Sequence, residues 1–163
     1  MNRLIRKIAC AVMALTLITG IFTGCASGDT EFFLNNSISL KEQNGSLPAE
    51  GTVGDIKYRI LEQNSLSVHE KKSGYYIDML EQLDSPYFIV ITSGPKTNEG
   101  AEISIVDLGM DGSTLQILVM ENEKSGGSSV AKFSPSCVLE VDHLPEEIQI
   151  HDKTGKIFSL IEE

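Results

Sequence analysis

The chain has 163 residues, of which 41% are hydrophobic and 22% are charged, and its formal net charge is −10 at pH 7. This size suits one domain with its own core. An acidic chain without a basic stripe is a poor ligand for nucleic acid, and three cysteines exclude a dense disulfide framework.

The first 24 residues have the pattern of a secretory signal. Three basic residues lie within the first seven positions, an apolar run covers 8–22, and Thr23 and Gly24 precede Cys25. As a helix the apolar run would be roughly 22 Å long, which is short for a hydrocarbon core of about 30 Å. The segment resembles a bacterial lipoprotein signal. The resemblance implies cleavage after residue 24, acylation of Cys25, and a place on the extracytoplasmic face of the cell membrane.

Removal of the signal leaves a more acidic protein. Residues 1–24 contain three basic and no acidic side chains, so the formal net charge changes from −10 to −13. The segment 25–54 is rich in Ser, Asn and Gly, which favours a flexible spacer behind the lipidated cysteine. Residues 55–163 are then predicted to form a single β-rich domain. Its contact with membrane lipid would run through the acyl chains on Cys25, each contributing about 0.8 kcal/mol per buried CH₂.

The first elements of the domain are a predicted strand and a predicted helix. Apolar and polar residues alternate over 56–62, which is typical of a strand. Tyr76, Met79, Leu80 and Leu83 follow the i, i+3, i+4, i+7 spacing of a helix. We therefore expect a helix that begins near 73 and ends before Pro86.

The rest of the chain reads as β structure. The continuous apolar run 87–91 suits a central strand covered on both faces. Alternation over 103–105 and 115–119 predicts a hairpin that turns at Gly112. Further short strands are predicted at 130–133 and 137–141, and a pair at 148–151 and 156–160. The expected fold is mainly β (α+β): an antiparallel sandwich or open barrel with one packed helix.

The segments 87–96 and 100–105, with the Asp111-Gly112 turn, resemble the C-terminal domain of PrcB-type protease-complex subunits. That family has a hydrophobic strand, a Gly-x-Lys turn and two strands joined through Asp-Gly. Here Gly94-Pro95-Lys96 matches the Gly-x-Lys turn, whereas Thr97-Asn98-Glu99-Gly100-Ala101 replaces the family's Pro-Thr-Gly-Gly-Tyr segment. The resemblance covers roughly residues 56–152. It implies a non-catalytic accessory domain that binds or stabilises an extracytoplasmic protein such as a protease.

The turn 96–100 lies in the family-like segment, so we expect it to be exposed and part of an interacting end; an ordinary hairpin loop is the alternative. Its candidate binding residues are Lys96, Asn98 and Gly100. The alternative interpretation is a surface lipoprotein that binds a small ligand or an ion, although a chain without tryptophan offers little for stacking.

The sequence does not predict enzymatic chemistry. The three histidines lack the spacing of a zinc site, so no metal and no cofactor are expected. Once Cys10 leaves with the signal and Cys25 carries lipid, Cys137 is the one thiol of the domain. It alternates with apolar residues of a predicted strand, which indicates a buried structural cysteine rather than a nucleophile.

Overall fold

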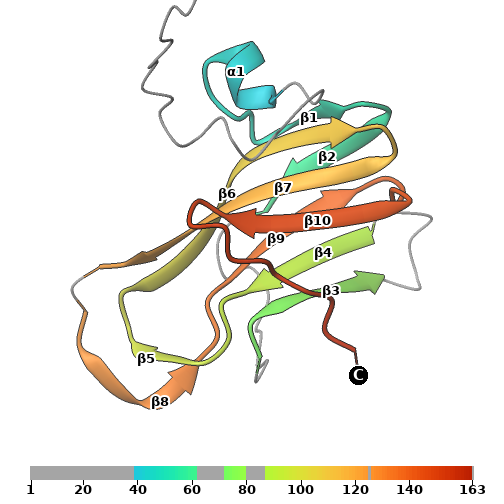
Figure 1. Ribbon diagram of the computed structural model, residues 1–163. Helices are drawn as coiled ribbons and strands as arrows, with labels where there is room; N and C mark the ends of the chain where they lie inside the picture. The colour runs from blue at the N-terminus through green and yellow to red at the C-terminus, as the bar shows by residue number, and fades with distance from the viewer. Residues whose placement is uncertain (1–38, 62–71, 80–86, 125, 163) are drawn as a thin grey trace, which may run out of the picture.

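The computed structural model describes residues 39–61, 72–79, 87–124 and 126–162 (Figure 1). The predicted signal, Cys25 and the second half of the predicted helix lie outside these ranges. Within them, no helix has both the length and the hydrophobicity needed to cross a membrane.

The described residues form one short helix and ten strands: α1 (Leu40–Asn44), β1 (Glu50–Val53), β2 (Ile56–Ile60), β3 (Gly74–Met79), β4 (Tyr87–Thr92), β5 (Lys96–Asn98), β6 (Ala101–Asp111), β7 (Thr114–Glu123), β8 (Ser128–Phe133), β9 (Ser136–Val141) and β10 (Glu147–Asp152). The strands make a five-stranded sheet in the order β1-β2-β9-β4-β3, a three-stranded sheet in the order β10-β7-β6, and the pair β5-β8.

One long β-ribbon connects the two sheets. Its first strand runs through β4, β5 and β6, and its second returns through β7, β8 and β9. Backbone hydrogen bonds continue the pairing between the named strands, as from Ser93 N to Pro135 O at 3.1 Å and from Lys124 N to Gly100 O at 3.0 Å. The ribbon bends between these strands, so that its tip half, β6-β7, belongs to one sheet and its base half, β4-β9, to the other (Figure 1).

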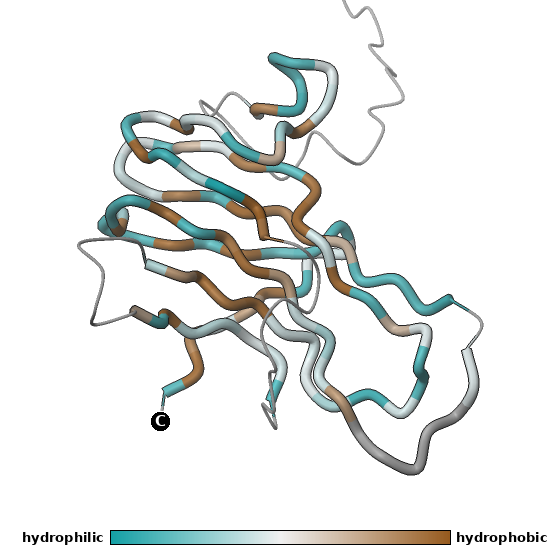
Figure 2. Tube along the Cα trace, turned by 180° about the vertical axis from the view of Figure 1, so that it is seen from behind, coloured by the Kyte–Doolittle hydropathy of each residue, from teal (hydrophilic) through white to brown (hydrophobic). Residues whose placement is uncertain are grey.

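The hydrophobic core combines apolar side chains from both sheets. Ile89 and Leu139 of the larger sheet and Leu115 and Ile117 of the smaller sheet are fully buried in one cluster. Hydrophobic residues accordingly run along the inner strands in Figure 2. Sheet-on-sheet burial of alternating residues is the arrangement expected of a β-sandwich. The mainly β fold with one short helix is therefore confirmed.

The predicted central strand is buried on both faces. In β4, Ile89 and Ile91 face the main core, while Val90 packs with Val138 in a second cluster. All four side chains are fully covered or nearly so. The predicted hairpin is also present, because β6 and β7 pair in antiparallel register and Gly112 takes a φ of +59° in the turn.

The helix prediction was wrong over the residues that can be checked. Residues 74–79 form β3, which pairs with β4 from Gly74 opposite Thr92 to Met79 opposite Tyr87. Tyr75, Tyr76 and Ile77 are aromatic or β-branched and prefer a pleated surface. Pairing with β4 therefore decides the structure of residues 74–79, although the i, i+3, i+4, i+7 spacing that starts at Tyr76 predicted a helix.

The single described helix instead lies inside the predicted spacer. Ser39, which caps α1, Leu40 and Val53 of β1 are all buried, so the folded body includes residues 39–54 and does not begin at residue 55. The helix is held by Asp107 of β6, whose Oδ2 accepts from Ser39 Oγ and whose Oδ1 accepts from Lys41 N at 3.0 Å. A polar, Ser-rich sequence concealed this contact, because its partner lies 66 residues away.

The C-terminal segment 156–162, which we call the strap, joins the edges of the two sheets. Phe158 N donates to Ile150 O of β10 at 2.9 Å, and Tyr75 N of β3 donates to Ser159 O at 3.0 Å. The predicted strand 156–160 is therefore present only in part, because the strap pairs with β10 at Ile157 and Phe158 and then turns to pair with β3. The smaller sheet is not wholly antiparallel, since β10 lies parallel to β7.

Candidate interaction site

The bend of the ribbon forms an arm, defined here as residues 96–100 and 126–133. It contains β5 and β8 and projects from the sandwich, whereas α1 lies at the opposite end of the molecule in both views (Figures 1 and 2). The three predicted binding residues, Lys96, Asn98 and Gly100, are brought together in this arm. The structure does not test whether they contact a partner.

Two of these residues hold the arm in shape. Lys96 Nζ lies 3.4 Å from Glu123 Oε1, and the lysine side chain is only 28% exposed. Asn98 accepts from Gly100 N at 2.9 Å and donates to Lys124 O at 3.2 Å. Because these polar groups already have partners inside the chain, they are less available than the sequence suggested.

The exposed positions of the arm are different ones. Thr97 and Glu99 are exposed beside the half-buried predicted residues, and the Lys124 side chain is 68% exposed at the edge of the arm. Strand alternation explains the difference, because Thr97 points away from the face that carries Lys96 and Asn98. Sequence reasoning missed these exposed positions, because the alternation identifies them only when residues 96–98 are known to form a strand.

Gly100 lets the two strands of the ribbon cross closely. A Cβ built on Gly100 would lie 2.4 Å from Lys124 O, and one on Gly126 would lie 2.4 Å from Gly100 N. Both neighbours are backbone atoms, which cannot move aside as a side-chain tip can. The glycines therefore permit direct backbone packing at the bend.

Replacing Gly100 with alanine is expected to lower the free energy of unfolding by about 2 kcal/mol, because it overpacks this crossing. Urea denaturation measures the change. Gly127→Ala is the matched control, since a Cβ there would meet only the Glu99 carboxylate tip, at 3.3 Å. Equal stability of the two variants would contradict the close-crossing explanation.

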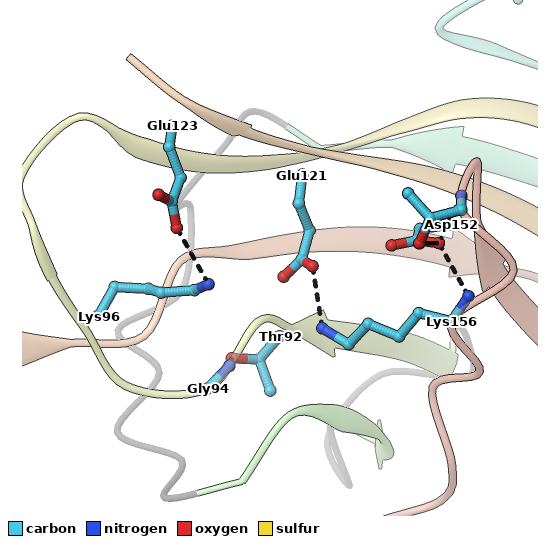
Figure 3. A network of polar contacts seen from close by, with 8 residues as sticks. Thr92, Gly94, Lys96, Glu121, Glu123, Asp152 and Lys156 are labelled. Atoms are coloured by element: carbon cyan, nitrogen blue, oxygen red, sulfur yellow. Dashed lines mark hydrogen bonds and ion pairs between the residues drawn. The ribbon is translucent and has the colours of Figure 1, made fainter. Parts of the chain in front are cut away.

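A network of charged groups lies between the arm and the sandwich (Figure 3). Lys156 of the strap donates from Nζ to Glu121 Oε2 of β7 at 2.9 Å, and it also lies 4.5 Å from the centre of the Phe158 ring. Asp152 Oδ1 accepts from Lys156 N at 2.9 Å and from Thr154 N at 2.8 Å. The network ties the start of the strap to the smaller sheet.

Both carboxylates of this network are stabilised in their charged form. Burial by itself raises the pKa of Glu121, but the Ser93 hydroxyl and the ammonium groups of Lys156 and Lys96 outweigh it and leave the pKa below its ordinary value. Oε1 of Glu121 is buried without a hydrogen-bond partner among the described residues, whereas Oε2 accepts from Lys156 Nζ. Burial likewise raises the pKa of Asp152, and hydrogen bonds around Thr154 and Lys156 lower it further than burial raises it.

These shifts predict acid sensitivity. A carboxyl group whose pKa is lower in the folded state stabilises the fold fully at pH values above its unfolded-state pKa. That stabilisation is lost as the pH falls through the folded-state pKa. Stability should therefore begin to fall as pH approaches the ordinary values of 4.5 for Glu121 and 3.8 for Asp152, and fall further below them. Thermal melts between pH 7 and pH 3 test this expectation. In Glu121→Gln the slope below pH 4.5 should be shallower, and an unchanged slope would contradict it.

A shallow hollow lies at the turns between strands. It has a volume of about 320 Å³ and is lined by residues that include Asp55, Met110, Ser113, His143 and Glu146. His143 lies between two carboxylates, with Nδ1 2.9 Å from Asp142 Oδ1 and Nε2 3.6 Å from Asp55 Oδ2. Among the described residues, no three His, Cys, Asp or Glu side chains gather as a group that could hold a metal ion.

Cys137 is buried in β9, as the sequence predicted, and it is not bonded to another cysteine. Burial raises the pKa of its thiol to about 12. The nucleophilic thiolate is therefore scarce at neutral pH. Cys137 serves the fold as a small apolar side chain.

Comparisons with protein-family models, with curated proteins and with solved structures found no match for this chain. The function is therefore argued from the residues and their arrangement alone.

Proposed function

We propose that this chain is a lipid-anchored protein on the extracytoplasmic face of the cell membrane, and that its non-catalytic β domain binds or stabilises another protein through the arm. The observation that carries the proposal is the position of the arm at the end of the sandwich opposite α1. The resemblance to PrcB-type subunits makes a protease complex the first partner to test.

The anchor and the arm are compatible in space. The chain from Cys25 to Ser39 can span at most roughly 50 Å, even when fully extended. It joins the body at α1, where Asp107 holds Ser39 and Lys41. An anchor at this end leaves the arm at the far end of the body, where another extracytoplasmic protein can reach it.

The anchor is tested by changing the acylated residue. Cys25→Ser is expected to move the protein from the membrane fraction to the soluble extracytoplasmic fraction, and intact mass should show acyl chains only on the parent chain. Membrane retention of an unacylated Cys25→Ser chain would contradict the lipid anchor.

The interaction is tested by site-specific crosslinking on cells. A photoreactive amino acid at exposed Thr97 in the arm should capture a defined extracytoplasmic protein. The same group at Thr52, which is exposed in β1 of the larger sheet, is the control and should not capture it. Equal capture from both positions, or none from Thr97, would contradict binding through the arm.

The alternative function is binding of a small ligand or an ion. The hollow beside His143 is the place to examine, because it gathers carboxylates, an imidazole and the Ser113 hydroxyl, which donates to Glu146 at 2.7 Å. A saturable rise in melting temperature with a small molecule or ion, abolished in His143→Ala, would favour this function over the first.

A further inference from the structure

Two of the four exposed large hydrophobic side chains among the described residues lie on β3, an edge strand of the larger sheet. β3 is the last strand of that sheet, and its residues Ile77 and Met79 are 39% and 53% exposed. Leu160 of the strap is 52% exposed. Strand edges that offer unpaired backbone groups beside apolar side chains are templates for pairing with another strand.

The strap already occupies one half of this edge. Tyr75 N donates to Ser159 O at 3.0 Å, and Ile161 N donates to Tyr75 O at 2.7 Å, so the strap lies parallel to β3 at this point. Leu160 stands opposite Tyr75 and shares its face of the sheet. Among the described residues these are the two backbone hydrogen bonds between the strap and β3, so a competing segment has two such bonds to replace.

The strap shows what chemistry the edge accepts. It is extended, it runs parallel to β3, and it places apolar Phe158 and Leu160 on the core-facing side with Ser159 between them. Tyr75, Ile77 and Met79 alternate onto that same side of β3. An occupant with apolar residues at every second position would cover Ile77 and Met79 as well as Tyr75.

Charge decides between the possible occupants. Asp78 lies beside the exposed pair in β3 and accepts from Met79 N at 2.8 Å, Glu162 ends the strap, and the whole chain has a net charge of −10. A second copy would bring acidic residues together at the edge, whereas a basic segment would oppose Asp78 with a positive charge.

We propose that the β3 edge is a strand-acceptor site, where an extended segment of a partner protein, with alternating apolar and basic residues, displaces the strap after Phe158 and pairs with β3. When no partner is bound, the strap pairs with Tyr75 and covers that half of the edge. This mode adds a strand to an existing sheet and draws its affinity from backbone hydrogen bonds. The surface is separate from the arm, so it stands whether or not the arm binds a partner.

The test weakens the strap without removing it. Ile161→Pro in the full chain deletes the amide that donates to Tyr75, and Ile161→Ala is the matched control because it keeps that amide. The probe is a labelled peptide with the sequence Ser-Leu-Lys-Val-Lys-Val, which in the register of the strap sets its valines opposite Ile77 and Met79 and its second lysine opposite Asp78. Its affinity is measured by fluorescence anisotropy. Ile161→Pro should bind it at least tenfold more tightly than Ile161→Ala.

Two further measurements locate the bound peptide and test its charge. Ile77→Asp added to Ile161→Pro should abolish binding, and a peptide with glutamate in place of both lysines should bind at least tenfold more weakly. Equal affinity of the Pro and Ala variants, or binding that ignores Ile77→Asp, would overturn the proposal. Dimerisation of the Ile161→Pro chain in sedimentation experiments, without peptide binding, would assign the edge to a second copy and equally overturn it. If Ile161→Pro does not fold, peptide added to the parent chain should still increase hydrogen exchange at the Ile161 amide, and no increase counts against the site.

Discussion

Substituting Phe158 with alanine is expected to lower the free energy of unfolding by about 3–5 kcal/mol, the usual cost of deleting a buried aromatic side chain. Phe158 is 2% exposed and is one of the largest fully buried side chains of the described core. Its loss would leave a cavity where the strap meets the two sheets. Urea denaturation followed by circular dichroism measures the change.

The neighbouring residue supplies the control. Ile157 is 64% exposed although it precedes Phe158 directly, so Ile157→Ala should change stability by no more than about 0.5 kcal/mol. Phe158→Leu keeps much of the volume and should fall between the two. A Phe158→Ala chain as stable as Ile157→Ala would show that the strap does not close the core.

Substituting Asp107 with alanine is expected to cost about 3 kcal/mol. Its carboxylate is buried and accepts from Ser39 Oγ, from Lys41 N at 3.0 Å and from Leu108 N at 2.8 Å. Alanine would leave these donors without their acceptor, and each buried unsatisfied donor costs about 1–3 kcal/mol. Because a five-residue helix has little stability of its own, α1 should detach first.

Asn is the matched replacement at position 107. It keeps the oxygen that accepts from both backbone amides, and Ser39 Oγ can accept from its new amide group, so Asp107→Asn should cost much less than Asp107→Ala. Hydrogen exchange at the Lys41 amide should accelerate in the alanine variant and change little in the asparagine variant. Similar exchange in both would mean that Asp107 does not hold the helix.

If the lipid anchor is present, detachment of α1 also has a functional consequence. The anchored chain would then join the body at β1 instead of α1, which would increase the range of distances between the arm and the membrane. Asp107→Ala should therefore broaden the distance distribution between a spin label on the arm and the bilayer, whereas Asp107→Asn should not.

The sequence predicted a strand correctly where the pattern of that strand's own residues was sufficient. The alternation over 56–62 correctly predicted β2, and the apolar run 87–91 correctly predicted β4. Both predictions succeeded because the order of apolar and polar side chains along a strand indicates which of its faces are buried. The β6-β7 hairpin followed from alternation on both sides of a glycine turn. These features depend on neighbours within a few residues.

The helix prediction failed because two periods overlap in a short segment. Tyr76 and Met79 are three residues apart, which fits a helix, yet Tyr75, Ile77 and Met79 also alternate as in a strand. The choice was made by β4, whose Ile89 lies opposite Ile77. A single chain segment does not reveal whether such a partner exists.

The candidate site shows the same division. The sequence singled out Lys96, Asn98 and Gly100, and the structure brings them into one arm, but their hydrogen bonds and close contacts run to Glu123, Lys124 and Gly126 across the ribbon. The exposed alternatives, Thr97 and Glu99, could be identified only from the strand register. The pairing of β3 with the strap left no signal in either segment.

The amino-acid sequence alone determined that this is a β-rich domain with a buried Cys137 and a glycine hairpin, and it alone carries the prediction of a lipid anchor. Only the tertiary structure decided that β3 is a strand, that α1 belongs to the folded body, and that one ribbon bends to supply both sheets. The physical reason is that alternation and turn chemistry act between neighbours, whereas strand pairing, the Asp107 contact and the strap join residues far apart in the chain.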